Sequence, residues 1–246
     1  MTLAIRGDRA TCLSVQLGPR TWLLAAARGF GCAGGLAIES ALLARLGAEC
    51  RRRARSARFR RTIDRPQSAA SSIIGMLSRI SADLYACTAS HEDYVVAAAS
   101  LTAVLVVQRR AFVMQAGSTA AYLAHDGDLA VISGDDALDL PGTPVLFHAV
   151  GTGPLLDLAI SSATLAPGDA IVLLDRRLRS PSERQALLAQ LEAADPGEHV
   201  LVARFEGDDS MQDQTGAASI RKPAKVSLLA RAVAGLGFLL ATVCIH

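Results

Sequence analysis

The sequence predicts an α+β fold in which two antiparallel sheets pack face to face and helices cover the outside. The order of elements is two strands, two helices, a run of strands, a helix and a last strand, so strands and helices are grouped rather than alternating. Turn dipeptides between apolar runs, such as Gly18-Pro19 and Asp126-Gly127, indicate hairpins. Residues 171–174 are apolar at every position, as expected for a strand covered on both faces.

The first half of the chain contains two strands followed by two helices. Residues 11–27 have the pattern of two strands joined at Gly18-Pro19. The glycine-rich residues 29–35 lead into a helix over 36–55, in which Ile38, Leu42 and Leu46 share one face. A second helix is expected over 68–88, and the arginine-rich segment between the helices, which ends at Pro66, is expected to connect them.

Strands dominate the second half. A capping box, Ser180-Pro181-Ser182-Glu183, with proline at the first helical position predicts a helix that begins there and ends near residue 194. A loop is expected around Pro141 and Gly142. Strands are expected at residues 101–107, 111–116, 120–124, 129–133, 158–165, 171–174 and 199–205.

Composition restricts the class of protein. Of 246 residues, 51% are hydrophobic and 20% are charged, which is typical of one globular domain with a filled core. The five cysteines are scattered and form no CxxC pair, so neither a zinc ribbon nor a disulfide framework is indicated and a reducing compartment is expected. Charges near the N-terminus occupy the place where a signal peptide needs an apolar stretch.

The C-terminal tail differs from the domain, which is expected to span residues 1–205. Residues 206–225 are expected to be a polar linker, and residues 226–245 carry a single charge, Arg231, over a length that can span a bilayer. Basic residues before this segment favour a cytoplasmic domain anchored in the inner membrane by a transmembrane helix. An amphipathic or buried C-terminal helix is the alternative.

Five short stretches, in order, resemble the metal-dependent PPM (PP2C-like) protein phosphatases. Gly117 to Leu129, GSTAAYLAHDGDL, is similar to the family hairpin GDSRAYLxRDGxL, and residues 165–178 are similar to LxPGDxLLLCSDGL. Weaker matches are the family's DGMGG with GExAS, LTxDHSL and TRALG, which correspond to residues 28–32 with Ser40, 132–138 and 148–151. The resemblance implies a four-layer αββα sandwich that hydrolyses phosphoserine and phosphothreonine with two Mg²⁺ or Mn²⁺ ions.

The chain departs from this family at the positions that hold the metals. The aspartates of DGMGG, GDSR and SDG correspond to Arg28, Ser118 and Arg176, although Gly29 is retained. The final DN pair falls near Pro196-Gly197, and the family's phosphate-contacting arginine is matched by Arg6. Hard divalent cations need carboxylate oxygens, so the resemblance implies a degenerate domain without catalytic residues, metal ligands or cofactor.

Several alternatives stay open at these positions. Asp8, Asp175 and Asp195 lie close to lost ligands, and a shifted register would give a residual phosphatase with a rearranged Mg²⁺ or Mn²⁺ site. A one-residue shift in a strand would, however, send the side chain to the opposite face. Arg28 and Arg176, together with Arg6, are candidates for phosphate binding, whereas the simpler interpretation is a decayed, solvated site with Arg176 paired to a neighbouring acid.

Other residues give weaker signals. Seven arginines between Arg51 and Arg61 could bind anionic lipid or nucleic acid, whereas the simpler interpretation is a solvated helix end. Phe59 is the only aromatic residue among them, so no stacking platform and no specific nucleic acid are expected. The histidines are expected to be ordinary surface or strand residues.

The sequence therefore favours a non-catalytic PPM domain, a pseudophosphatase, that binds a protein partner at the membrane. The expected partner is a phosphoprotein or a Ser/Thr kinase. Two alternatives are a residual phosphatase and an interaction module in which the former active site plays no part.

Overall fold

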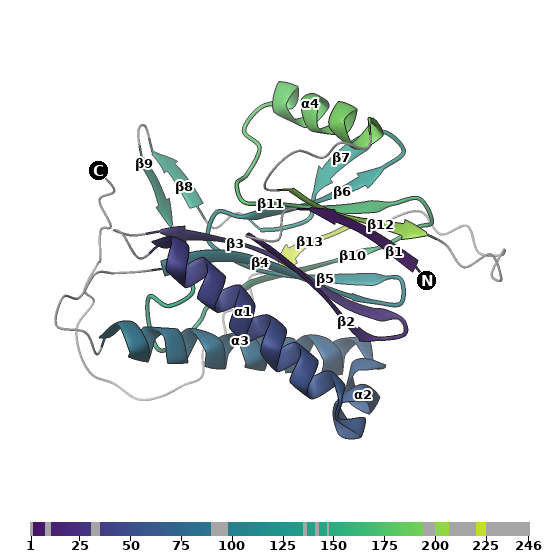
Figure 1. Ribbon diagram of the computed structural model, residues 1–246. Helices are drawn as coiled ribbons and strands as arrows, with labels where there is room; N and C mark the ends of the chain where they lie inside the picture. The colour runs from purple at the N-terminus through teal and green to yellow at the C-terminus, as the bar shows by residue number, and fades with distance from the viewer. Residues whose placement is uncertain are drawn as a thin grey trace.

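The computed structural model describes residues 2–7, 11–30, 35–89, 98–134, 137–140, 143–146, 148–193, 200–206 and 220–224. Two antiparallel sheets pack face to face in these residues, with helices on both outer surfaces (Figure 1). The predicted four-layer αββα sandwich is therefore confirmed.

The smaller of the two main sheets has five strands in the order β1-β12-β11-β6-β7. Their bounds are β1 Thr2–Gly7, β12 Val200–Glu206, β11 Ala170–Leu174, β6 Ala120–His125 and β7 Asp128–Val131. The larger sheet has six strands in the order β13-β10-β5-β4-β3-β2. Their bounds are β13 Ile220–Ala224, β10 Ala159–Thr164, β5 Arg110–Ala116, β4 Ala98–Val107, β3 Thr21–Phe30 and β2 Cys12–Gly18.

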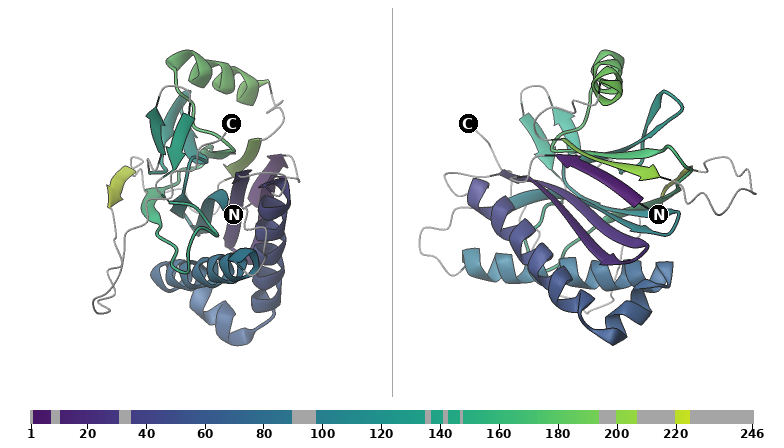
Figure 2. Two further views of the ribbon diagram at one scale, coloured as in Figure 1. Left: turned by 90° about the vertical axis from the view of Figure 1, so that its left-hand side faces the viewer. Right: turned by 45° about the vertical axis from the view of Figure 1, so that its right-hand side comes forward.

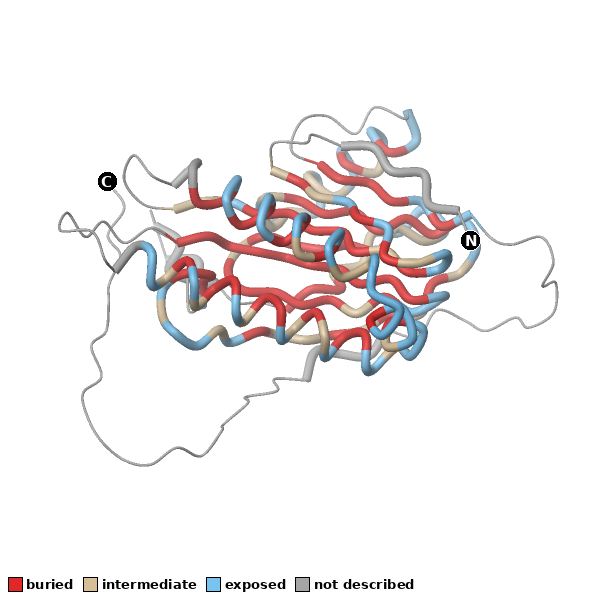
Figure 3. Tube along the Cα trace, turned by 60° about the horizontal axis from the view of Figure 1, so that its bottom comes forward, coloured by how far each residue is buried: buried red, intermediate tan, exposed pale blue. Residues whose placement is uncertain are grey.

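Helices α1 (Gly35–Ala54), α2 (Ala57–Ile63) and α3 (Pro66–Ala89) cover the six-stranded sheet, and α4 (Pro181–Glu192) covers the five-stranded sheet. Figure 2 shows α4 on the opposite side of the sheets from the other three helices. Seen from the helical side, α1 and α3 alternate between buried and exposed positions, whereas the strands behind them are almost entirely buried (Figure 3). This pattern is that of amphipathic helices on a sheet with both faces covered.

The apolar residues form three layers that follow the alternation of the strands. In β3, Ala25 and Ala27 face α1 and α3, whereas Leu24 and Ala26 face the other sheet. The same alternation in β4 leaves all ten residues of that strand buried. Tyr122, Leu187 and Leu191 belong to the third layer, between the five-stranded sheet and α4. Because side chains alternate along a strand, the face on which a polar residue at the strand's end lies can be assigned from the apolar residues before it.

Four segments differ from the sequence predictions. The arginine-rich connection contains α2, because Phe59 and Ile63 lie four residues apart and are both buried. On either side of Pro141 and Gly142, which lie outside the described residues, β8 (Ala137–Leu140) pairs with β9 (Thr143–Leu146), where a loop was expected. Strand β1 was not predicted and pairs with β12. Within the segment expected to be a linker, β13 pairs with β10.

The predicted transmembrane segment, residues 226–245, lies outside the described residues. Among the helices that the structure describes, none combines the length and the apolar character that crossing a membrane requires.

Candidate functional site

The segments that resemble the metal-binding motifs all meet at one end of the sandwich, called the rim below. Arg28, near the end of β3, is opposite Ser100, near the start of β4. Leu174, the last residue of β11, is opposite Ala120 of β6 and Val200 of β12. Strand β1 ends at the same rim, because Arg6 is opposite Val202. Strand pairing therefore brings together positions that lie far apart in the sequence.

Arg28 continues the face of β3 that points toward the other sheet, since it follows Ala26 by two residues. It is exposed, and its guanidinium lies over the ring of Phe30 at 5.7 Å from the centroid. The next residue, Gly29, donates its backbone N–H to the carboxylate of Glu39 on α1. Glu39 is only 5% exposed, so this carboxylate ties α1 to the end of β3.

Ser118 lies between β5 and β6, where the chain passes from one sheet to the other. Its backbone N–H donates to Ser100 Oγ at 2.8 Å, and the two hydroxyl oxygens are 3.3 Å apart. The side-chain amide of Gln115 donates to the carbonyl oxygens of Gly117 and Thr119, each at 2.8 Å. The crossover is therefore fixed by neutral hydroxyl and amide groups.

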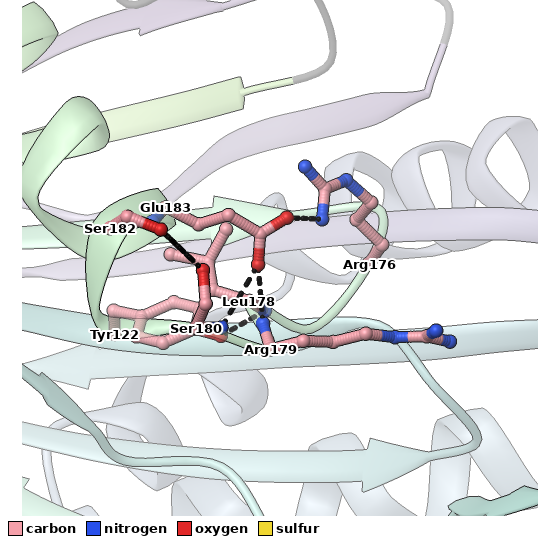
Figure 4. Close-up of polar contacts among 7 residues, drawn as sticks. All are labelled: Tyr122, Arg176, Leu178, Arg179, Ser180, Ser182 and Glu183. Atoms are coloured by element: carbon pink, nitrogen blue, oxygen red, sulfur yellow. Dashed lines mark hydrogen bonds and ion pairs between the residues drawn. The ribbon is translucent and has the colours of Figure 1, made fainter.

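Arg176 lies in the loop between β11 and α4, where Glu183 holds it (Figure 4). Arg176 Nη1 donates to Glu183 Oε1 at 2.8 Å, and Glu183 Oε2 accepts the backbone N–H groups of Arg179 and Ser180 at 2.6 and 3.1 Å. These bonds, the Arg179 N–H first and Arg176 second, lower the pKa of Glu183 to about 2. The carboxylate is therefore ionised at neutral pH and pairs with Arg176.

Further bonds fix the same loop on its two sides. The backbone N–H of Leu178 donates to the hydroxyl of Tyr122 at 2.7 Å, and Arg177 donates to the carbonyl oxygen of Gly134 at 3.1 Å. Burial raises the pKa of the Tyr122 phenol, which therefore stays protonated at neutral pH. The capping carboxylate of Glu183, the hydroxyl of Tyr122 and the carbonyl oxygen of Gly134 therefore hold this loop together.

The described side chains of the rim do not fit a divalent cation. Arg28 and Arg176 bring positive charge, and Ser118 brings a neutral hydroxyl that is shared with Ser100. The carboxylates of Glu39 and Glu183 are occupied by the hydrogen bonds given above. Across the whole described part of the chain, no three His, Cys, Asp or Glu side chains are grouped so that they could hold a metal ion. Mg²⁺ and Mn²⁺ need several oxygen ligands, mostly carboxylates.

The sequence predictions for single residues have mixed outcomes. Arg28, Gly29, Ser118 and Arg176 lie at the one rim, and Arg6 reaches it with its backbone, although its side chain lies outside the described residues. Asp8 and Asp195 also lie outside them. The pairing of Arg176 with a neighbouring acid, one of the two interpretations of that residue, is what the structure shows.

Three residues that the motif comparison did not single out contribute to this rim. Glu183 was predicted as a capping residue, and the structure confirms the capping box, but its bond to Arg176 was not predicted. Ser100 was not predicted, because its role depends on pairing with Ser118 across the crossover. Glu39 could have been found from the sequence as a carboxylate next to the buried face of a helix.

No family model and no curated protein matches this chain in sequence. Solved structures match it closely in fold. PppA of Pseudomonas aeruginosa has a TM-score of 0.60 at 19% identity, over 82% of this chain and 96% of that one. The Mycobacterium tuberculosis serine/threonine phosphatase PstP/Ppp has a TM-score of 0.55 at 17% identity, over 84% of this chain and 99% of that one.

A third structure, the serine/threonine phosphatase Stp1 of Staphylococcus aureus, has a TM-score of 0.59 at 12% identity and covers 84% of this chain and 94% of its own. The match covers nearly the whole length of each of these three structures. In the present chain it includes the two antiparallel sheets and the helices that cover them. The chain therefore has the fold of the bacterial PPM-type (PP2C-like) serine/threonine phosphatases.

Proposed function

We propose that this protein is a non-catalytic phosphatase-fold domain, a pseudophosphatase, that binds a protein partner at the membrane. The observation that carries the proposal is the rim itself. Strand pairing brings together the positions that correspond to three aspartates of the phosphatase motifs, and these positions are occupied by two arginines and a serine. A divalent cation is repelled by guanidinium groups, so the two-metal chemistry that such a fold implies has no ligands among them.

A phosphoprotein or a kinase suits the rim better than an uncharged partner does. Arg28 is exposed and forms no ion pair with a described carboxylate, so its guanidinium can donate hydrogen bonds to a phosphoryl oxygen. Arg176 is half-exposed, with 52% of its side chain accessible, and it keeps donor groups beyond the one that Glu183 uses. The two arginines define the surface on which the partner is expected to dock.

The membrane part of the proposal comes from the sequence and from the place of β13. Ala224, the last residue of β13, is opposite Ile160 of β10. The neighbouring residue of β10, Ala159, pairs with Gln115 of β5. Gln115 pairs with Thr102 of β4, two residues from Ser100, so β13 ends near the rim. An apolar segment that starts at residue 226 would keep the rim close to the membrane surface. A partner for the rim would then lie at that surface too.

Catalysis is tested first, with the full-length chain in mild detergent. We expect no hydrolysis of para-nitrophenyl phosphate or of a phosphothreonine peptide above background at millimolar Mn²⁺ or Mg²⁺. The variant Asp175→Ala is the matched control, because Asp175 is the described carboxylate beside Arg176. Metal-dependent turnover that disappears in this variant would mean that the protein is a residual phosphatase with a rearranged site.

Partner binding is tested by affinity purification of the full-length chain and of the double variant Arg28→Glu/Arg176→Glu. Proteins that co-purify through the rim are expected to be lost from the double variant and retained by Arg110→Glu, which reverses an exposed charge on another strand. If both variants retain the same proteins, the rim plays no part and the chain is an interaction module of another kind.

A further inference from the structure

A concave surface, called the hollow, lies away from the rim, where α2 meets the end of α1 and the start of α3. It has a volume of about 340 Å³. Phe59, which is 7% exposed, contributes its apolar wall. Its polar lining consists of three arginines and three hydroxyl residues, namely Arg52, Arg53, Arg58, Ser56, Thr62 and Ser72. Guanidinium and hydroxyl groups around one hollow are the donors that bind phosphoryl oxygens.

Two of the arginines are held in place by a single carboxylate. Arg52 donates to both oxygens of Glu49, at 2.8 and 2.7 Å, and Arg53 donates to Oε1 at 2.6 Å. These bonds, led by that of Arg52, lower the pKa of Glu49 to about 2, so it stays ionised at neutral pH. One negative charge thus fixes two positive groups and neutralises only one of them.

The position of Arg58 in α2 is not one at which a positive charge stabilises a helix. Cations stabilise a helix near its C-terminus and destabilise it near its N-terminus. Arg51, Arg52 and Arg53 are in the last turn of α1, where such a role suffices. Arg58 is the second residue of α2, whose first turn contains no acidic residue. The N-cap of α2, Ser56, makes no side-chain capping hydrogen bond, so its hydroxyl is not used by the helix.

The surface around the hollow is strongly positive. Eight of the fifteen residues from Arg51 to Arg65 are arginines, and the one acid among them is Asp64. Those outside the hollow, Arg51, Arg55, Arg60, Arg61 and Arg65, are exposed. Within the described part of the chain, none of these five, nor Arg58, forms an ion pair. An anionic partner would meet a concave centre surrounded by unneutralised guanidinium groups.

The hollow is distinct from the rim. A methyl group added at Gly18, the last residue of β2, would lie 3.3 Å from Ile63 of α2, so α2 lies beside the turn from β2 to β3. Thr21 begins β3 there, and Arg28 lies near its other end. Seven residues of extended strand span roughly 20 Å. A ligand in the hollow therefore does not reach the rim.

We propose that the hollow formed by Arg52, Arg53 and Arg58 binds a phosphoryl group on an acidic segment of a partner protein. A concave site with fixed donors fits a discrete phosphoryl group, and the surrounding arginines fit acidic side chains on either side of it. A flat bilayer does not enter a concave site, and Phe59, the aromatic residue of the hollow's lining, is buried, so the described lining offers no exposed ring to stack on bases. This site stands independently of the proposed function of the rim.

The test is fluorescence anisotropy with the full-length chain and a labelled peptide, phosphothreonine flanked by four glutamates, with its unphosphorylated form as the comparison. We expect the phosphopeptide to bind at least tenfold more tightly, and Arg58→Glu to weaken it at least tenfold. Arg58→Glu places an acid at the N-terminus of α2, which favours the helix, so loss of binding is not loss of folding. Arg58→Gln is expected to have a smaller effect in the same direction, and Arg110→Glu should change the affinity less than twofold.

Three results would overturn the proposal. The phosphopeptide and its unphosphorylated form could bind equally, which would mean a non-selective cationic surface. The affinity could be unchanged in Arg58→Glu and lost in Arg28→Glu/Arg176→Glu, which would assign phosphate binding to the rim and leave the proposed function intact. Vesicles containing phosphatidylserine could bind in an Arg58-dependent manner while the phosphopeptide does not, which would assign the surface to the membrane.

Discussion

At the scale of single residues, the backbone before Ser118 depends on a glycine. Gly117 has a φ of +88°, which side-chain-bearing residues rarely adopt. A Cβ at this position would also collide with the hydroxyl of Ser100 and lie 2.8 Å from its Cβ. The contact between Ser100 and Ser118 therefore requires glycine at position 117 for two separate reasons.

We predict that Gly117→Ala destabilises the protein by about 2–4 kcal/mol, of which backbone strain gives about 1–2 and the collision gives the rest. Gly127 is the matched control, because its φ is +80° but nothing lies within 4 Å of a Cβ there. Gly127→Ala should therefore cost only the strain. Urea denaturation measures the free energy of unfolding of both variants. Equal decreases would show that Ser100 moves aside without a loss of stability.

Arg176 and Glu183 show what a residue pattern can and cannot predict. The capping box predicted that Glu183 would accept backbone N–H groups at the start of α4, since that bond lies within four residues. The bond to Arg176 spans seven residues and depends on the path of the loop, to which Tyr122 contributes from another strand. A local pattern fixes a local bond, whereas the partner of a long side chain depends on the loop.

At the scale of elements, a histidine joins two turns. His125, the last residue of β6, has its Nδ1 2.6 Å from Asp169, which lies in the turn before β11 and is only 1% exposed. The other oxygen of Asp169 accepts the backbone N–H of Ala166 at 2.7 Å. The prediction that the histidines are ordinary residues missed this link, because the two turns are 44 positions apart.

This link predicts a pH-dependent stability. The hydrogen bond and charge of Asp169 raise the pKa of His125, and Asp126 and Asp128 act in the same direction. His125 also lines a small pocket, separate from the hollow, together with Glu192 of α4 and Arg204 of β12. Because the pKa is raised on folding, the stabilisation is complete below the ordinary value near 6.5 and is lost as the pH rises through the raised pKa.

We therefore expect the difference in Tm between the wild type and His125→Gln to be larger at pH 5.5 than at pH 9. Arginine keeps its charge across this range. The difference in Tm between His125→Arg and His125→Gln should therefore be the same at both values of pH. Differential scanning calorimetry measures all three proteins. A difference that is the same at both values of pH would mean that the imidazolium charge does not contribute.

Helix α2 shows why a short element is hard to predict. Its two buried residues, Phe59 and Ile63, are a single i,i+4 pair among arginines, and seven residues give too few turns for a clear period. Helices α1 and α3 have 20 and 24 residues, and their apolar faces predicted their bounds to within about two residues. Length, rather than composition, made the difference.

At the scale of the whole molecule, ends of strands from both sheets meet at the rim, so carboxylates introduced there should act together. We predict that Arg28→Asp/Ser118→Asp/Arg176→Asp binds Mn²⁺ with an affinity at least tenfold above that of the wild type, because three carboxylates would be added at the same rim. Isothermal titration calorimetry with Mn²⁺ measures this. Each single substitution is the control and should give little binding. A triple variant without gain would show that these positions do not share a cleft.

The sequence by itself determined the fold class, because apolar periodicity, turn dipeptides and the capping box are local patterns that survive without family-level identity. It also predicted which residues correspond to the phosphatase motifs. The tertiary structure decided which of those residues meet. The bonds of Ser118 to Ser100, Gly29 to Glu39 and Arg176 to Glu183 depend on strand register and loop path. These are set by long-range packing, and no local pattern contains that information.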